Sequence, residues 1–96
     1  AYQVVKGAIP QFTRALAREF AADHIRINAV APGIVRTRFH AKLSEEQRKV
    51  NVEQRIPLGY EGQPEHIATA VVELATNDYI TGETLVVDGG LTMRIA

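Results

Sequence analysis

The sequence predicts an α/β fold in which two parallel strands are joined by a long crossover that contains helices. Two short runs, residues 25–30 and 84–88, are rich in apolar and β-branched side chains and are bounded by turn residues, as buried strands are. The segments around them show helical periodicity. Because two strands are too few for a stable parallel sheet, further strands should come from an N-terminal part that this sequence lacks, or from another chain.

A long amphipathic helix is expected at residues 2–22. Its apolar side chains recur at helical spacing, at Tyr2, Val5, Ile9, Phe12, Leu16 and Phe20. Pro10 lies inside this pattern. Because proline lacks an N–H donor and crowds the preceding turn, we expect a kink or a local loosening there. The helix should continue past Pro10, since the periodicity does.

Between the two strands we expect a mobile lid at residues 36–56 and a second helix at residues 64–76. The lid carries many charges and few large apolar residues, with one short helix that starts at Ser44 and runs to about Asn51. A segment that buries so little should have low local stability. Pro64 and Glu65 mark the start of the second helix.

The composition argues against several classes of function. A formal net charge of zero, from 11 basic and 11 acidic residues, points to neither nucleic acid nor an anionic membrane as a partner. The sequence has no cysteine and no apolar run long enough to span a bilayer. His24, His40 and His66 lack ligand spacing, so we expect no metal site. The sequence indicates a soluble protein, for which we expect a cytoplasmic location.

Tyr2 and Lys6 are four residues apart, so in a helix they share one face and can serve one site. A neighbouring cation favours phenolate over phenol and lowers a tyrosine pKa that is otherwise about 10, which brings the phenol toward proton transfer near neutral pH. The pair alone is weak evidence, because the same spacing also occurs on solvated helix faces. The rest of the sequence decides between these interpretations.

Three segments, in order along the chain, resemble the short-chain dehydrogenase/reductase family. Tyr2-x-x-x-Lys6 is similar to the family's active-site motif, residues 28–37 to its strand-to-loop segment under the nicotinamide, and residues 80–90 to the last strand of the classical subgroup. The resemblance implies the C-terminal portion of a Rossmann-like, doubly wound parallel sheet. It also implies that the N-terminal nucleotide-binding part, with its Gly-rich loop and catalytic serine, is absent from this chain.

By this resemblance, Tyr2 is the general acid/base of a hydride transfer between NAD or NADP and an alcohol or carbonyl substrate. Lys6 would bind the nicotinamide ribose and lower the tyrosine pKa, so both residues are expected to be catalytic and to contact the cofactor. The segment 36–56 would cover the substrate.

The cofactor is also expected to meet the loop after the first strand. Pro32 and Gly33 would let the chain leave the carboxyl end of that strand close to a ligand. By resemblance, Val35 through its backbone and Thr37 through its hydroxyl would contact the nicotinamide carboxamide. For Thr37, a plain loop role remains open.

Two hypotheses stay open at this point. In the first, the chain is part of an NAD(P)-dependent oxidoreductase that is active only when complete, so the 96-residue chain alone should be inactive. In the second, it is a non-catalytic α/β fragment or module that acts through self-association or partner binding. Apolar and small residues on more than one side of the helix at 2–22, together with the habit of the family, predict a homodimer or homotetramer.

Overall fold

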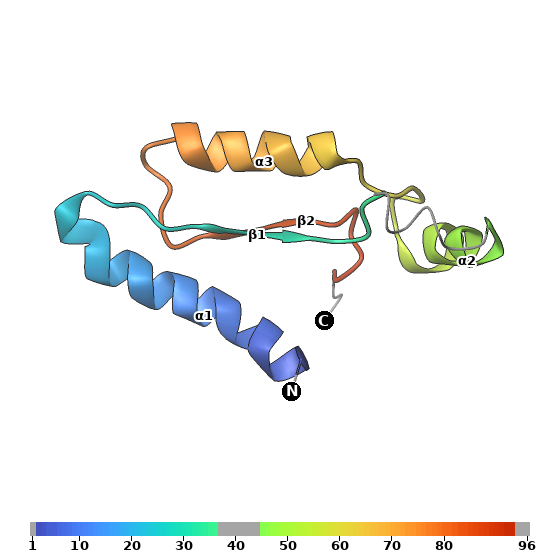
Figure 1. The fold of residues 1–96 in the computed structure, drawn as a ribbon, viewed down its shortest axis with the longest axis horizontal. Coiled ribbons are helices and arrows are strands. Elements are labelled where there is room, and N and C mark those ends of the chain that lie inside the picture. The colour runs from blue at the N-terminus through green and yellow to red at the C-terminus, as the bar shows by residue number, and fades with distance from the viewer. Residues whose placement is uncertain (1, 37–44, 94–96) are drawn as a thin grey trace. The chain divides into compact units, whose positions relative to one another are not determined.

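The computed structural model describes residues 2–36 and 45–93, and the chain falls into two compact units. The first unit holds Ala1–Val30 and Ala70–Leu85, and the second holds Ala31–Thr69 and Val86–Ala96. The elements follow in the order α1 (Tyr2–Phe20), η1 (Ala21–Asp23), β1 (Ala29–Pro32), α2 (Glu45–Val50), η3 (Asn51–Arg55), α3 (Pro64–Thr76) and β2 (Thr84–Val87) (Figure 1). Both strands and helix α3 contribute residues to each unit.

Strands β1 (Ala29–Pro32) and β2 (Thr84–Val87) pair in a two-stranded sheet. In the first unit the Ala29 N–H donates to the Glu83 carbonyl (2.9 Å), and in the second unit the Gly33 N–H donates to the Val87 carbonyl (3.0 Å). Donor and acceptor advance together along the chain, so the strands are parallel. The predicted α/β fold with parallel strands is confirmed.

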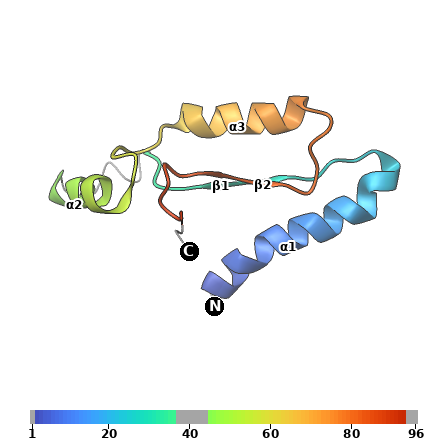
Figure 2. The same ribbon diagram turned by 180° about the vertical axis from the view of Figure 1, so that it is seen from behind.

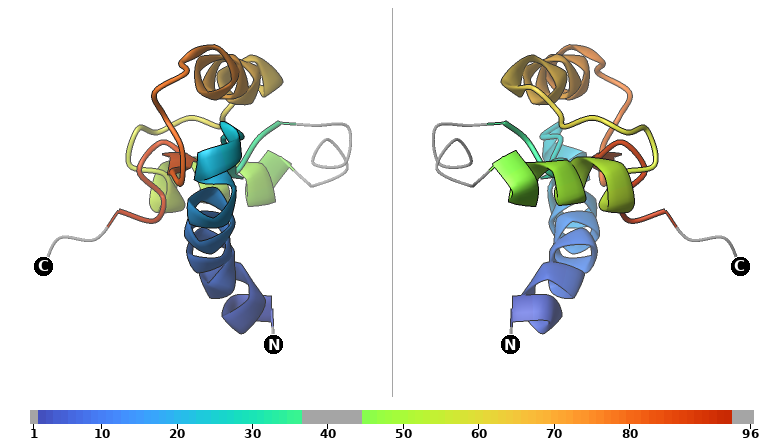
Figure 3. Two further views of the ribbon diagram at one scale, coloured as in Figure 1. Left: turned by 90° about the vertical axis from the view of Figure 1, so that its left-hand side faces the viewer. Right: turned by 90° about the vertical axis from the view of Figure 1, so that its right-hand side faces the viewer.

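Helix α1 (Tyr2–Phe20) runs without interruption through Pro10 (Figures 1 and 2). It is followed by the 3-10 helix η1 (Ala21–Asp23), which covers the last part of the helix predicted at residues 2–22. Within the first unit, α1 and the C-terminal half of α3 lie on opposite sides of the strand starts (Figures 1 and 3). This arrangement is a helix on each face of a parallel sheet.

The face of α1 that the first unit buries is made of small residues. Ala17 is 4% exposed, whereas Phe12, which belongs to the predicted apolar stripe, is 65% exposed. A Cβ added to Gly82 would lie 3.4 Å from the Ala17 Cβ, so the loop before β2 comes close to the helix. Small side chains permit this close approach, and the large apolar side chains Ile9 and Phe12 remain outside it.

Arg26 anchors the chain between η1 and β1 to the end of α3 (Pro64–Thr76). Its guanidinium donates to the carbonyls of Leu74 (2.7 Å), Ala75 (2.8 Å) and Ile80 (3.1 Å). The last carbonyls of an α-helix have no partner within the helix and lie at the negative end of its dipole. The Arg26 guanidinium supplies hydrogen-bond donors to these carbonyls, and its positive charge interacts favourably with the negative end of the dipole.

The strand predicted at residues 25–30 begins later than expected, at Ala29, and continues to Pro32. Polar side chains account for the difference. The Asn28 amide donates to the Ile80 carbonyl (3.0 Å), and its oxygen accepts from the Glu83 N–H (3.0 Å). Side-chain bonds of this kind, with those of Arg26, replace a regular main-chain ladder at residues 25–28.

In the second unit, α2 (Glu45–Val50) passes directly into the π-helix η3 (Asn51–Arg55). Helical structure therefore continues past Asn51, where the predicted short helix was expected to end. Ile56 follows in an extended conformation and is 4% exposed. Residues 37–44 lie outside the described residues, and the mobility of the segment 36–56 stays a prediction.

Helix α3 has the bounds predicted for it, with Pro64 as its first residue and Glu65 in its first turn. Ala70 and Leu74 are its buried residues, whereas Val71 is half exposed. Across the parts of the chain that the structure describes, none of the helices combines the length and the apolar character needed to cross a bilayer.

Replacing Arg26 by alanine should lower the free energy of unfolding of the intact protein by about 2 kcal/mol, because three carbonyl oxygens lose a charged donor. Urea denaturation followed by circular dichroism measures this change. Arg14→Ala is the matched control, since Arg14 is exposed and donates to the Gln11 side chain. The control should cost less than about 0.5 kcal/mol, and equal losses in the two variants would contradict the anchoring role.

Candidate functional site

The chain leaves β1 at Gly33, which passes close to Asp88 at the end of β2. A Cβ added to Gly33 would lie 2.5 Å from the Asp88 Cβ and 2.8 Å from its Cα, so a side chain there would force the backbone apart. The sequence suggested that Gly33 permits the approach of a ligand. In the structure, the neighbour that requires a glycine is the protein's own main chain.

Beyond Gly33, the chain pairs with the loop before α3. The Gly62 N–H donates to the Ile34 carbonyl, and the Arg36 N–H donates to the Gly62 carbonyl, both at 2.9 Å. This is an isolated parallel bridge between Val35 and Gly62. Because the neighbours of Val35 make both bonds, the peptide N–H and C=O of Val35 itself face the opposite edge.

A second backbone contact fixes the loop that follows η3. The Leu58 N–H donates to the Gly89 carbonyl (3.0 Å). Gly89 has a φ of 63°, and a Cβ on it would lie 2.9 Å from the Ile56 Cγ2, so both conformation and space call for glycine. The loop at residues 56–62 is therefore held to both strand ends.

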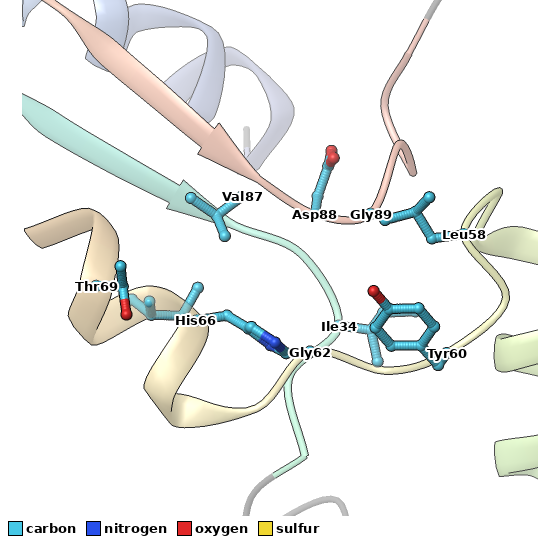
Figure 4. A pocket seen from close by; sticks show the side chains of 10 residues that line it. Ile34, Leu58, Tyr60, Gly62, His66, Thr69, Val87, Asp88 and Gly89 are labelled. Atoms are coloured by element: carbon cyan, nitrogen blue, oxygen red, sulfur yellow. The ribbon is translucent and has the colours of Figure 1, made fainter.

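These contacts enclose a cavity of about 300 Å³ within the second unit (Figure 4). Its walls are mostly apolar and come from both strand ends, the loop at 56–62 and the start of α3: Ile34, Leu58, Gly62, Ile67, Val87 and Gly89. The remaining lining residues are Tyr60, His66, Thr69 and Asp88. A concave, largely apolar space with a few polar groups is typical of small-molecule sites.

The Asp88 carboxylate is engaged by its own turn. Its Oδ1 accepts from the Gly90 N–H (2.9 Å), and its Oδ2 accepts from the N–H and the hydroxyl of Thr92 (3.0 and 2.6 Å). Partial burial tends to raise the pKa of the Asp88 carboxyl, but the bonds from Thr92 and Gly90 outweigh that tendency and hold the pKa below its ordinary value of 3.8. The segment at residues 88–90 thus forms a turn.

His66 has a role that the sequence analysis missed. Its Nδ1 accepts the Gln63 N–H (2.8 Å), while the His66 N–H donates to the Gln63 carbonyl (2.9 Å). The side chain thereby takes the part that Glu or Gln plays three residues after the N-cap in a capping box. His66 is the third residue after Gln63, which precedes the first helical residue Pro64, so its position fits a capping box. The sequence did not indicate this role because the residue there is a histidine and not the usual Glu or Gln.

A second hollow of about 430 Å³ adjoins the same loop in the second unit. It shares Tyr60 and His66 with the cavity, and it is also lined by Arg36, Val52, Gln63 and the buried side chain of Glu61. Within residues 2–36 and 45–93, no group of three His, Cys, Asp or Glu side chains could hold a metal ion.

The predicted catalytic pair belongs to the first unit. Tyr2 and Lys6 lie in the opening turns of α1, and their side chains are outside what the structure describes. The roles assigned to them stay predictions.

Of the residues predicted to meet the cofactor beside that pair, three come together in the second unit. Pro32 ends β1, and Gly33 and Val35 follow it at the carboxyl end of the strand. Thr37 falls outside the described residues. The structure adds Leu58, Tyr60 and His66, which line the neighbouring cavity and were not predicted.

Comparison with known proteins gives a consistent set of relatives. A family model described as enoyl-(acyl carrier protein) reductase matches residues 1–92. The chain is 49% identical over 92 residues to the 3-oxoacyl-(acyl-carrier-protein) reductase of Homo sapiens, which is 96% of this chain and 37% of that protein. The enzyme of the same name from Mus musculus is 46% identical over 95 residues, 99% of this chain and 39% of that protein.

A relative with a different name matches the same part of the chain. The 3beta-hydroxysteroid dehydrogenase 1 of Eggerthella lenta is 41% identical over 95 residues, which cover 96% of this chain and 36% of that protein. The chain therefore spans between 36% and 39% of the length of these three relatives.

The Asp88 turn should make stability depend on pH. Because the folded-state pKa lies below the ordinary 3.8, the carboxylate stabilises the fold above that value and loses this effect as the pH falls through the folded-state pKa. At neutral pH, Asp88→Asn should lower the free energy of unfolding by roughly 0.5–1 kcal/mol, a range reduced for solvent screening. The difference from the unmodified protein should shrink below pH 3.8.

Urea midpoints of both proteins across this range measure the effect. The control is Asp78→Asn, because the Asp78 carboxylate makes no hydrogen bond to the residues that the structure describes. A difference between Asp88→Asn and the unmodified protein that stays constant down to low pH would show that the charge is not the stabilising element.

Proposed function

Because this chain belongs to the short-chain dehydrogenase/reductase family, we propose that the intact protein is an NAD(P)-dependent oxidoreductase acting on an alcohol or carbonyl substrate. One observation carries the proposal: the family match at residues 1–92 includes Tyr2-x-x-x-Lys6 and the segment 28–37 in the family's order. Relatives named as reductases and as a hydroxysteroid dehydrogenase support a reaction that interconverts carbonyl and hydroxyl groups.

Tyr2 and Lys6 carry the proton chemistry in this proposal. The nicotinamide, when bound, supplies or accepts the hydride. In the direction of reduction, Tyr2 donates its phenolic proton to the carbonyl oxygen while the carbonyl carbon receives the hydride, so a hydroxyl forms and the phenolate later regains a proton from solvent. Lys6 holds the cofactor ribose and favours the phenolate, which lowers the tyrosine pKa toward neutral pH.

In this proposal the cofactor binds in the second unit, at the carboxyl end of β1, because open α/β sheets bind their ligands at that end of their strands. Pro32 is exposed there, and Gly33 follows it with Asp88 on the side where a Cβ would lie. The peptide groups of Val35 face away from Gly62, an orientation compatible with main-chain contact to a carboxamide. We assign Pro32, Gly33, Val35 and Thr37 to this contact, with NAD or NADP as the cofactor.

Replacing Tyr2 by phenylalanine in the intact protein should reduce turnover by roughly 100-fold or more, because the ring remains and the proton is lost. Oxidation of the reduced cofactor with a ketone substrate, followed by absorbance, measures turnover. The affinity for the cofactor, measured by fluorescence titration, should change little. Nearly normal turnover in the variant would show that another group supplies the proton.

The printed 96-residue chain serves as a negative control in the same assay. We propose that it shows no cofactor-dependent turnover alone, because the phosphate-binding turn of such folds lies in their N-terminal half. Turnover by this chain at the rate of the intact protein would contradict the proposal that an N-terminal half is needed to bind the cofactor phosphates.

We also propose that the intact protein forms a homodimer or homotetramer, for which the exposed Ile9 and Phe12 of α1 provide an apolar surface in the first unit. Sedimentation velocity at micromolar concentration should show a species heavier than the monomer. Phe12→Ser should shift it toward monomer, whereas Val72→Ser, at a similarly exposed position of α3, is the comparison. A monomer alone in the unmodified protein would refute this proposal.

A further inference from the structure

Leu58 and Tyr60 stand exposed beside the cavity although the loop that carries them is fixed. They are 63% and 56% exposed, respectively, and both line the cavity. Their backbone is held by the bonds from Leu58 to Gly89 and from Gly62 to Ile34. Large apolar side chains that are fixed in place and left open to solvent are typical of a surface that binds a ligand.

His66 adds a directed hydrogen-bond donor to this cavity. Since Nδ1 accepts the Gln63 N–H, the neutral ring carries its proton on Nε2. Nε2 has no hydrogen-bond partner among residues 2–36 and 45–93. In Figure 4 the imidazole points from α3 toward Gly62, along the cavity wall. The cap thus selects the tautomer that presents N–H rather than a lone pair.

The other polar groups narrow the choice of ligand. The Thr69 hydroxyl donates to the Glu65 carbonyl (2.8 Å), and the Asp88 carboxylate is engaged with its own turn. The Tyr60 hydroxyl makes no hydrogen bond within the part of the chain that the structure describes. The lining therefore combines the donors of His66 and Tyr60 with mostly apolar walls, and the nearby Asp88 carboxylate disfavours an anion.

We infer that this cavity receives an apolar part of the substrate: a neutral chain or ring that carries a hydrogen-bond acceptor oxygen. The inference rests on the proposed function, which assigns the cofactor to the segment that includes Ile34, a wall of the cavity. A volume of about 300 Å³ lies at the small end of ligand sites, which suits a ring or a short chain. Leu58 packs on the apolar body, and His66 donates to its oxygen.

The apolar contact is tested in the intact protein with acetone, methyl butyl ketone and methyl phenyl ketone. Leu58→Ala should raise KM for the two larger ketones roughly tenfold and leave KM for acetone and for the cofactor unchanged. Val72→Ala, at a similarly exposed position on α3 in the first unit, should alter none of these values. A rise in KM for the cofactor, or an equal rise for all ketones, would overturn the assignment.

The polar contact is tested with methyl hexyl ketone and a counterpart whose chain ends in a primary amide. His66→Glu keeps an acceptor for the Gln63 N–H, so Tm should not fall, but it removes the Nε2–H donor. KM for the amide-bearing ketone should rise roughly tenfold and that for methyl hexyl ketone should not. Tyr60→Phe should act in the same direction, with the highly exposed Tyr79→Phe as its control. Identical behaviour of both ketones in His66→Glu would overturn the donor role.

Ligand-observed NMR with methyl phenyl ketone separates this inference from the proposed function. Suppose that the unmodified protein binds the ketone and Leu58→Ala weakens this binding, but no cofactor supports turnover. The assignment of the cavity is then supported and the proposed reaction is refuted. If turnover occurs and Leu58→Ala binds and reduces the ketone normally, the reaction stands and the cavity assignment falls.

Discussion

Gly33 lies so close to Asp88 that no side chain would fit on Gly33, and the other contacts of the second unit depend on this approach. It places the ends of the two strands side by side, where the Gly33 N–H completes the pairing with Val87. Directly beyond it, the Asp88 turn and the positive φ of Gly89 direct the chain back to the loop at 56–62. These main-chain hydrogen bonds hold in place the segments whose side chains line the cavity.

The first unit is held together differently. There, Arg26 and Asn28 reach carbonyl groups at the end of α3 and in the loop that follows, so side-chain bonds add to the main-chain bonds between the strands. A guanidinium that satisfies the last carbonyls of a helix also opposes the negative end of its dipole. Charge and geometry therefore stabilise the same contact.

Local sequence signals predicted the elements whose boundaries are set locally. Pro64 and Glu65 mark the start of α3 because proline and an acidic residue suit the first helical turn whatever surrounds them. The start of β1 was misplaced because it depends on partners more than 50 positions away in the chain: Arg26 and Asn28 bond to Ile80, and no local pattern reveals this. Ala17, rather than Phe12, is buried in α1 because the approach of Gly82 selects a small residue.

The same distinction applies to the candidate site. The pair of Tyr2 and Lys6 could be proposed from the sequence, because the chemistry expected of it needs only two residues at one spacing in one helix. The cavity could not be predicted, because Leu58, His66 and Val87 come from three separate segments that only the fold brings together. The tautomer of His66 depends in turn on a bond to Gln63, which exists only after α3 has formed.

The π-helix η3 has a consequence for how this protein tolerates changes in length. A π-helical turn accommodates one residue more than an α-helical turn, and such turns act as insertions that a helix has absorbed. Deleting one residue from Asn51–Arg55 would remove the absorbed residue and restore α-helical geometry while the chain after it keeps its orientation. Ile56 would then keep its buried position beside Gly89, and the loop that bounds the cavity would keep its anchor. Adding a residue to a regular α-helical turn would instead rotate everything after it by about 100°. This segment therefore tolerates the loss of one residue better than the gain of one.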